Sequence, residues 1–318
     1  MKTLQSLRAG WIYLILLFGL ITLCWYALVL RGQDAMSGLS WNSRPLTKSL
    51  LTVNFGVYDP EAEFSDSDFI AVDHYFLDWR KIDDSGIQTL LDKTHNKNRW
   101  LLLTIEPWVE EDKKSGLMED ISAGVYDNRI TGICSLINSS ASPVLIRFAH
   151  EMERVTGRYP WAVSQPDMYI SAYRRFVSLC RPLIKDGFFV WSPAGDKGLE
   201  KYWPGHEYAD YIGLSVYHYP RYEQDNYHRD FSFQEIFSEK FNRIKDFSKP
   251  VILAEVGVTG DKAYQTAWLR RGIAGLISFP SVKTLVYFNA QDSPGAWPSA
   301  YQVPNWHIDP SALQIPEK

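Results

Sequence analysis

Val144-Leu-Ile-Arg-Phe-Ala-His-Glu-Met152 is an apolar run that changes to polar residues at its carboxyl end. A second run of the same kind, Pro250-Val-Ile-Leu-Ala-Glu-Val-Gly257, carries a glutamate at the corresponding place. Runs of this composition form strands that are buried on both faces. Glu151 and Glu255 are therefore expected at the carboxyl ends of two strands, which is the edge where parallel barrels place their reactive side chains.

Similar apolar runs alternate with helical patterns along most of the chain. Strands are expected at 51–58, 69–73, 100–106, 144–150, 187–191, 211–217, 250–255 and 282–288, and the clearest helices at 126–137, 168–184, 233–247 and 262–279. Such alternation is typical of a parallel sheet with right-handed crossovers, and no glycine-rich phosphate loop follows the first strand. The sequence therefore predicts an α/β fold, a (β/α)8 TIM barrel. In this barrel Glu151 ends the fourth strand and Glu255 the seventh.

Length and charge narrow the possible partners. The chain has 318 residues, of which 46% are hydrophobic, enough for one barrel of roughly 250 residues and an appendage. Its 33 basic and 37 acidic side chains give a net charge of −4, and no basic block is present, which disfavours nucleic acid as a partner. Several of the 12 tryptophans sit in polar contexts, such as Trp108 in Glu106-Pro-Trp108 and Trp161 in Tyr159-Pro-Trp161. Indoles there could pack on the apolar faces of sugar rings or simply fill the core.

The N-terminal segment predicts a membrane anchor. Trp11 to Leu30 contains no charged residue and is long enough to cross a bilayer core of about 30 Å. Because Lys2 and Arg8 precede it, the N-terminus should remain in the cytoplasm. We therefore expect a cytoplasmic stretch at 1–10, a transmembrane signal anchor at 11–30, a tether at 31–48 and a catalytic barrel at 49–318. The barrel would lie outside the cytoplasmic (inner) membrane, in the periplasm of a Gram-negative cell.

The composition of this segment disfavours two other interpretations. A cleaved signal peptide would have an apolar region of about 7–15 residues and a small-residue cleavage site, but the run is longer and no Ala-x-Ala follows. A lipid-modified Cys24 is disfavoured because bulky Leu23 precedes it. Cys134 and Cys180 fall in separate helical patterns; a disulfide between them is possible, although two buried thiols are favoured. No metal-ligand spacing is found among the seven histidines, and no cofactor is predicted.

Two carboxyl groups at one barrel mouth match the needs of glycosidic bond cleavage. One protonates the leaving oxygen while the other meets the anomeric carbon. A gap of about 5–5.5 Å allows direct attack with retention of configuration, and a wider gap admits water and gives inversion. The two pKa values must differ, and a hydrogen bond from Tyr217 could keep Glu255 ionised. Arg147 could stabilise negative charge at the mouth or form an ion pair in the barrel interior.

These residues resemble glycoside hydrolase family 26, within the clan of retaining glycosidases that carry an acid/base after strand 4 and a nucleophile after strand 7. The resemblance rests on His150 before Glu151, on Arg147 in Arg-x-x-His-Glu, and on a series of further matches between residues 50 and 310. These are Glu106-Pro-Trp108, Tyr159-Pro-Trp161, Trp191-Ser-Pro193, Trp203-Pro-Gly205, Tyr211-Ile-Gly-Leu with Tyr217, Ala254-Glu-Val-Gly257 and Asn305-Trp-His-Ile-Asp309. Family members include β-mannanases and some β-glucanases and β-xylanases.

The resemblance implies a role for individual residues. Glu151 would be the acid/base and Glu255 the nucleophile, with His150 and Tyr217 orienting the nucleophile and the sugar and Trp161 serving as a sugar platform. The other substrate-binding candidates are Arg147, Trp108, Trp191 and Ser215. There are departures from the family pattern at the mouth: Glu153 replaces a usual asparagine, 154–158 are extra residues, and Ser215 stands where aspartate is common. Because a serine lacks the charge of an aspartate, the preferred sugar is left open.

The sequence as a whole predicts a membrane-anchored retaining endo-β-glycosidase. Its substrate would be a β-linked polysaccharide, such as a mannan-like polymer, a glucan or the cell's own exopolysaccharide, and no nucleic acid is involved. A signal anchor suits an enzyme that processes polymer at its own cell surface. Two alternatives remain: a barrel that binds glycans without cleaving them, and a transglycosylase in which a sugar hydroxyl replaces water.

Overall fold

The computed structural model describes residues 53–314 of the chain. The expected cytoplasmic stretch, anchor and tether lie outside these residues, as do residues 315–318. Within 53–314, none of the helices combines the length and apolar character needed to cross a bilayer.

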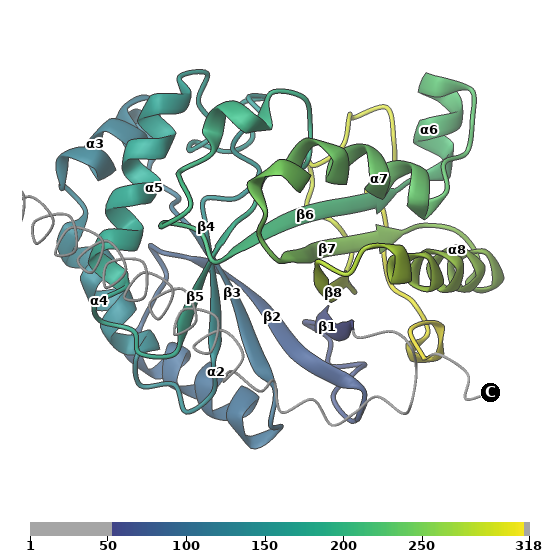
Figure 1. Cartoon of the computed structure of the whole chain (residues 1–318), viewed down its shortest axis with the longest axis horizontal. Helices are drawn as coiled ribbons and strands as arrows, with labels where there is room; N and C mark the ends of the chain where they lie inside the picture. The colour runs from purple at the N-terminus through teal and green to yellow at the C-terminus, as the bar shows by residue number, and fades with distance from the viewer. Residues whose placement is uncertain (1–52, 315–318) are drawn as a thin grey trace, which may run out of the picture. The chain divides into compact units, whose positions relative to one another are not determined.

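The described residues form a closed barrel of parallel strands in which neighbours along the chain are also neighbours in the sheet. Figure 1 shows the strands converging at the centre with helices outside them. The strands are β1 (Asn54–Tyr58), β2 (Ile70–Asp78), β3 (Trp100–Glu106), β4 (Val144–Phe148), β5 (Gly187–Trp191), β6 (Tyr211–His218), β7 (Val251–Val258) and β8 (Val282–Phe288). Pairing of β1 with β8 closes the barrel. The predicted (β/α)8 barrel is therefore confirmed.

α-Helices lie between most of the successive strands, and local sequence explains where several of them begin. They are α2 (Asp84–Asn96), α3 (Leu117–Ala123), α4 (Asp127–Ile137), α5 (Pro166–Cys180), α6 (Pro220–Tyr227), α7 (Phe233–Ile244) and α8 (Lys262–Gly275). Ser232 and Glu235 form a capping box at the start of α7, and Asp261 caps α8. Proline opens α5 and α6, where its missing N–H costs nothing.

The fourth strand is shorter than the sequence predicts. It was expected to run to His150, but β4 ends at Phe148 because Ala149 and Glu151 both adopt left-handed backbone conformations, with φ of 48° and 53°. Such conformations are unfavourable for non-glycine residues and are often found at functional sites. The Glu151 N–H donates to the Ser192 carbonyl oxygen at 2.8 Å, which ties this turn to the end of β5.

The two cysteines of the described residues, on helices outside the strands, are paired, contrary to the expectation of two separate buried thiols. Cys134 at the end of α4 and Cys180 at the end of α5 form a disulfide, with their Cα atoms 5.3 Å apart. The expectation was wrong because the two helical patterns, although distant in sequence, pack side by side on the barrel. Sequence spacing alone carried no information on that contact.

Candidate active site

Arg147 is the centre of a polar layer inside the barrel, below the carboxyl ends of the strands. Its side chain is completely buried. Nε donates to Ser192 Oγ at 2.9 Å, and Nη1 donates to Thr104 Oγ1 at 3.3 Å. The same Nη1 lies 2.6 Å from Glu255 Oε1. The sequence left two roles open for Arg147, a stabiliser of negative charge at the mouth and a partner in an interior ion pair. It has both, because its ion pair is with Glu255, one of the two candidate catalytic glutamates.

A glycine on β6 makes this arrangement possible. A Cβ atom at Gly213 would lie only 2.4 Å from Ser192 Oγ, closer than non-bonded atoms can approach. Any larger residue would displace the hydroxyl that fixes Arg147. The close approach of β5 and β6 thus positions the guanidinium, which in turn holds Glu255.

Glu255 is held from two sides in a manner that favours its ionised form. Besides the ion pair with Arg147, the Tyr217 hydroxyl donates to Glu255 Oε2 at 2.6 Å. The hydrogen bond expected from the sequence is therefore present. Burial raises the pKa of Glu255, Arg147 lowers it, the nearby charge of Glu151 raises it and Tyr217 lowers it, and the balance lies above the usual value.

Glu151 lies at the same mouth and is held by β6. Ser215 Oγ donates to Glu151 Oε1 at 2.7 Å. Ser215 is paired with Glu255 in the register between β6 and β7. Because alternate residues of a strand share a face, Ser215 and Tyr217 point the same way, one bonded to each glutamate. Two residues of one strand, about 6.6 Å apart, therefore anchor the two carboxyl groups.

An arginine from the extra segment contacts Glu151. Arg154 Nη1 lies 3.5 Å from Glu151 Oε2, and its Nε donates to Asp196 Oδ2 at 2.7 Å. Burial alone would raise the pKa of Glu151, but Arg154, the Ser215 hydroxyl and Arg147 together hold that pKa below its usual value. The resting site thus favours an ionised Glu151, although an acid/base must carry a proton when the bond breaks.

Glu153, one of the departures from the family pattern, supports this contact from behind. Its Oε1 accepts hydrogen bonds from the backbone N–H groups of Gly195 and Asp196, at 2.9 and 3.1 Å. It thereby fixes the loop after β5 that presents Asp196 to Arg154. Lys240 of α7 donates to the backbone oxygens of Ala194 and Ser215 in the same region, and burial lowers its pKa to about 8.

A second arginine of the extra segment lies at the mouth without a hydrogen bond to the described residues. The Arg158 guanidinium carbon is 4.9 Å from the centroid of the Tyr159 ring, and Nη2 is 3.9 Å from Asp292 Oδ1. Burial lowers the pKa of Arg158, but nearby acidic groups, including Glu151 and Glu255, raise it above its usual value. The roles of Arg154, Arg158 and Asp292 were not anticipated, although the insertion directly after Glu151 was a signal for the two arginines.

Glu106 adds a third carboxyl group to the mouth. It ends β3 and accepts a hydrogen bond from Trp108 Nε1 at 3.1 Å. Burial raises the pKa of Glu106. Trp108, a candidate for substrate binding, is half-buried beside it and packs edge-on against Trp161 with ring centroids 4.9 Å apart.

The structure differs from expectation at two other tryptophans. Trp161 has no exposed surface, since Tyr159 stacks on it at 4.6 Å and its Nε1 donates to the His150 carbonyl oxygen. Its ring is therefore not open to a sugar in this structure. Trp191 is also fully buried and packs against Trp203 and Phe247 rather than against the glutamates. Successive residues of a strand face opposite sides of the sheet. Ser192 faces Arg147 inside the barrel, so Trp191 faces outward.

His150 is buried next to this aromatic group. Its ring centroid lies 5.0 Å from that of Tyr159 and 5.9 Å from that of Phe76. Burial and the nearby arginines hold the pKa of His150 well below its usual value, so its ring is neutral at physiological pH. No hydrogen bond from His150 to Glu255 is present, and its orienting role stays a prediction.

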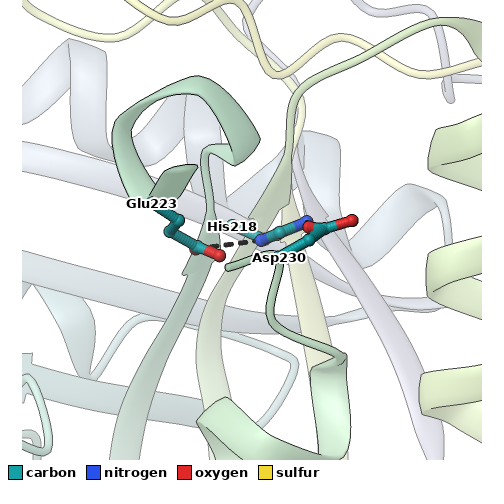
Figure 2. A group of neighbouring side chains, drawn as sticks. All are labelled: His218, Glu223 and Asp230. Atoms are coloured by element: carbon teal, nitrogen blue, oxygen red, sulfur yellow. Dashed lines mark hydrogen bonds and ion pairs between the residues drawn. The ribbon is translucent and has the colours of Figure 1, made fainter. Parts of the chain in front are cut away.

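One group among the described residues has donors of the kind that bind metal ions. His218 Nδ1 lies 2.9 Å from Glu223 Oε1, and His218 Nε2 lies 2.9 Å from Asp230 Oδ1 and 2.7 Å from the Tyr264 hydroxyl. Figure 2 shows the imidazole between the two carboxylates. Because its two nitrogens point in opposite directions, one ion could not be bound through the ring and by both carboxylates. The group is better explained as a hydrogen-bond network that joins the loop after β6 to α8.

Comparisons with known proteins agree with the site. Residues 119–265 match the model of glycosyl hydrolase family 26, a range that includes both glutamates, Arg147, Ser215 and Tyr217. Endoglucanase H of Acetivibrio thermocellus is 24% identical over 229 residues, which cover 68% of this chain and 24% of that protein. The chain thus spans about a quarter of the length of this curated relative.

Solved structures share the fold. The β-mannanase BoMan26A of Bacteroides ovatus aligns with a TM-score of 0.57 and 14% identity, covering 74% of this chain and 80% of that one. A modular endo-β-1,4-mannanase of Cellulomonas fimi aligns with a TM-score of 0.59 and 15% identity, covering 77% and 68%. At such identities the likeness concerns the fold, whereas the family match extends over the site itself. Over residues 119–265, slightly less than half of its length, the chain is similar to glycosyl hydrolase family 26.

Proposed function

We propose that the barrel is a retaining endo-β-glycosidase in which Glu255 is the nucleophile and Glu151 the acid/base. The observation that carries this proposal is that both carboxyl groups lie at one mouth, with Glu151 bonded to Ser215 and Glu255 held by residues of the barrel interior. Glu255 is bound by a guanidinium and a phenol that favour an anion, at 2.6 Å each. Ser215 and Tyr217, which share one face of β6, each donate to one of the two carboxyl groups and so bring both to the same mouth, as direct attack requires.

The first half of the reaction replaces the leaving group by the enzyme. A Glu255 oxygen forms a bond to the anomeric carbon as the glycosidic bond breaks, and Glu151 transfers its proton to the departing oxygen. Glu255 becomes neutral when it forms the ester bond. Arg147 and Tyr217 stay in place and stabilise the carboxylate when it forms again. In the second half, Glu151 takes a proton from water, the water oxygen bonds to the anomeric carbon, and Glu255 leaves as a carboxylate.

The proton on Glu151 is the step that the resting site opposes. Arg154 favours the ionised form of Glu151, while the charge of Glu151 raises the pKa of Glu255. One proton is therefore shared by a coupled pair. When it resides on Glu151, the repulsion between the glutamates disappears and Arg147 and Tyr217 hold Glu255 as the anion. Substrate binding that reduces the pull of Arg154 on Glu151 would favour this state.

The substrate is proposed to be a β-linked polysaccharide. The relatives described above are two mannanases and an endoglucanase, so mannan and glucan are the first polymers to examine. Ser215 bonds to Glu151 and offers no charged acceptor to a sugar hydroxyl. A sugar that depends on an aspartate at this position should therefore be recognised less strongly.

Covalent trapping tests the proposed function. The purified protein would be incubated with 2-deoxy-2-fluoro β-glycosides of mannose, glucose and xylose, and its mass measured. A retaining glycosidase should gain the mass of one fluorosugar, located on Glu255, and the Glu255→Gln variant should gain none. Reducing-end release from mannan, mixed-linkage glucan, xylan and host exopolysaccharide identifies the polymer, and product analysis separates hydrolysis from transglycosylation. Glycan binding without labelling or release would instead support the non-catalytic alternative.

We propose further that residues 11–30 anchor the chain in the cytoplasmic membrane with the barrel outside. The uncharged run, Lys2 and Arg8 support this topology. The Cys134–Cys180 disulfide adds support, since such bonds persist in oxidising compartments. An enzyme held there would act on the cell's own exopolysaccharide. Alkaline extraction should leave the protein in the membrane fraction, and deletion of its gene should alter surface polysaccharide length; release by alkali or unchanged polysaccharide would contradict the respective proposal.

A further inference from the structure

We propose that Arg158, supported by Arg154, forms a subsite for an acidic sugar residue, so that the polysaccharide bound at the mouth carries carboxylate groups. This inference rests on the proposed function and extends it to the chemical class of the substrate. Both arginines belong to the segment 154–158, which begins three positions after the candidate acid/base Glu151.

The position of Arg158 is fixed, but its hydrogen-bonding capacity is unused within the described residues. Its guanidinium lies over the Tyr159 ring, and that ring is stacked on buried Trp161. Contact with an aromatic face orients the guanidinium plane and leaves the N–H groups at its edge free to donate. The side chain is 34% exposed, so a ligand can reach it. An arginine in this state is suited to bind a carboxylate through two parallel hydrogen bonds.

The nearest acidic side chain does not neutralise Arg158 fully. Asp292 Oδ1 is 3.9 Å from Arg158, beyond hydrogen-bond distance, and accepts the backbone N–H of Ser293 at 2.7 Å. Asp292 Oδ2 accepts from the indoles of Trp297 and Trp306, at 2.9 and 3.2 Å. With both oxygens already bonded, Asp292 serves as an electrostatic guide for Arg158 rather than as its hydrogen-bond partner.

The charge of the site also favours an anionic ligand during catalysis. Arg154 is balanced by Asp196 and by ionised Glu151 in the resting structure. When Glu151 carries the proton that the reaction requires, Arg154 loses part of its counter-charge. A carboxylate of the substrate near Arg158 would restore the balance and so stabilise the protonated acid. A neutral polysaccharide would supply no such compensation.

The attraction must be local because the chain as a whole carries a net charge of −4. Long-range electrostatics would therefore repel an acidic polymer rather than bind it. At physiological ionic strength, charges separated by more than about 8 Å are largely screened. A preference for an acidic polymer under these conditions can be assigned to charges at the binding site.

Affinity electrophoresis of the full-length chain in a neutral detergent tests the subsite without needing turnover. Carboxymethyl-cellulose and hydroxyethyl-cellulose share one backbone, and carboxymethyl-mannan and mannan share another. At 150 mM salt, the carboxylated polymer of at least one pair should bind about tenfold more tightly than its neutral partner, as expected for one charge-assisted hydrogen bond. Arg158→Gln should reduce this ratio to about twofold or less, and Arg158→Lys should retain part of it.

The matched control is Arg270→Gln on α8, where an exposed arginine donates to the backbone oxygen of Ser311. It should leave the ratio unchanged. Sulfated cellulose shows whether the subsite accepts any anion or requires a carboxylate. Equal binding of acidic and neutral polymers on both backbones, or an unchanged ratio in Arg158→Gln, would overturn the inference. Labelling of Glu255 with no acidic preference would refute only this subsite, whereas an acidic preference without labelling would refute only the proposed function.

Discussion

Removing the positive charge of Arg154 should raise the pKa of Glu151. The ion pair spans 3.5 Å between Arg154 Nη1 and Glu151 Oε2. Coulomb's law at this distance gives about 1 kcal/mol in water and about 5 kcal/mol at an effective dielectric constant of 20. Because Arg154 is 38% exposed and also pairs with Asp196, we take about 1.5–3 kcal/mol. Arg154→Gln should therefore raise the pKa of Glu151 by about one to two units.

The sign of the effect on activity follows from the proposed role of Glu151 as proton donor. With a higher pKa, Glu151 keeps its proton to higher pH, so the alkaline limb of kcat/KM should move upward by a similar amount. Because Glu151 and Glu255 titrate as a coupled pair, both limbs belong to the pair, and a measurement on Glu151 itself is needed to assign the shift.

Carboxyl carbon NMR of protein labelled with ¹³C-glutamate measures the pKa directly and needs no substrate. Glu151→Gln assigns the signal, and Arg154→Lys, which keeps the charge, is the matched control. A Glu151 pKa that is unchanged or lower in Arg154→Gln would refute this account of the site.

Three further changes probe the nucleophile and the barrel wall. Tyr217→Phe removes the 2.6 Å hydrogen bond to Glu255, so kcat/KM should fall about 10- to 100-fold and the acidic limb should move to higher pH; an unchanged limb would contradict the role of the phenol. Gly257→Ala would place a methyl group 2.7 Å from the Tyr217 ring and should give a similar loss, with no further loss in the double variant; fully additive losses would show that the two act separately. Cys134→Ala opens the loop of 46 positions that the disulfide closes, so the free energy of unfolding in denaturant should fall by about 4 kcal/mol. Reductant should lower the stability of the parent protein and leave that of the variant unchanged. Equal stability of parent and variant would contradict the disulfide.

The sequence predicted the barrel well because its strands are marked by apolar runs with polar ends. The expected strands at 100–106, 187–191 and 282–288 coincide with β3, β5 and β8. The helices α2, α3 and α6 were not identified. The mean hydropathy of α6 is low and its helical pattern is weak, so that its start is marked mainly by Pro220. Short polar helices of this kind depend on tertiary contacts more than on sequence periodicity.

The site was predicted less evenly. The barrel topology leaves little freedom at the carboxyl ends of the strands. It therefore brings together the residues that lie at or near these ends, namely Glu151, Glu255, Arg147, Ser215 and Tyr217. Other contacts depend on loop conformation and on which face a side chain takes, which an alternation of apolar residues does not specify. This is why Trp161 and Trp191 were expected at the ligand but lie in the core. It is also why the contact of Arg154 with Glu151 became visible only in the folded chain.

The central claim is the division of roles between Glu151 and Glu255, and azide rescue of their alanine variants tests it most directly. With a substrate identified by the polysaccharide screen, an activated glycoside of the same sugar would be hydrolysed in the presence of azide. In Glu151→Ala, azide should attack the glycosyl-enzyme and give a β-glycosyl azide of retained configuration. In Glu255→Ala, azide should take the place of the missing nucleophile and give the α-azide. The opposite assignment of anomers, or the same anomer from both variants, would contradict the account.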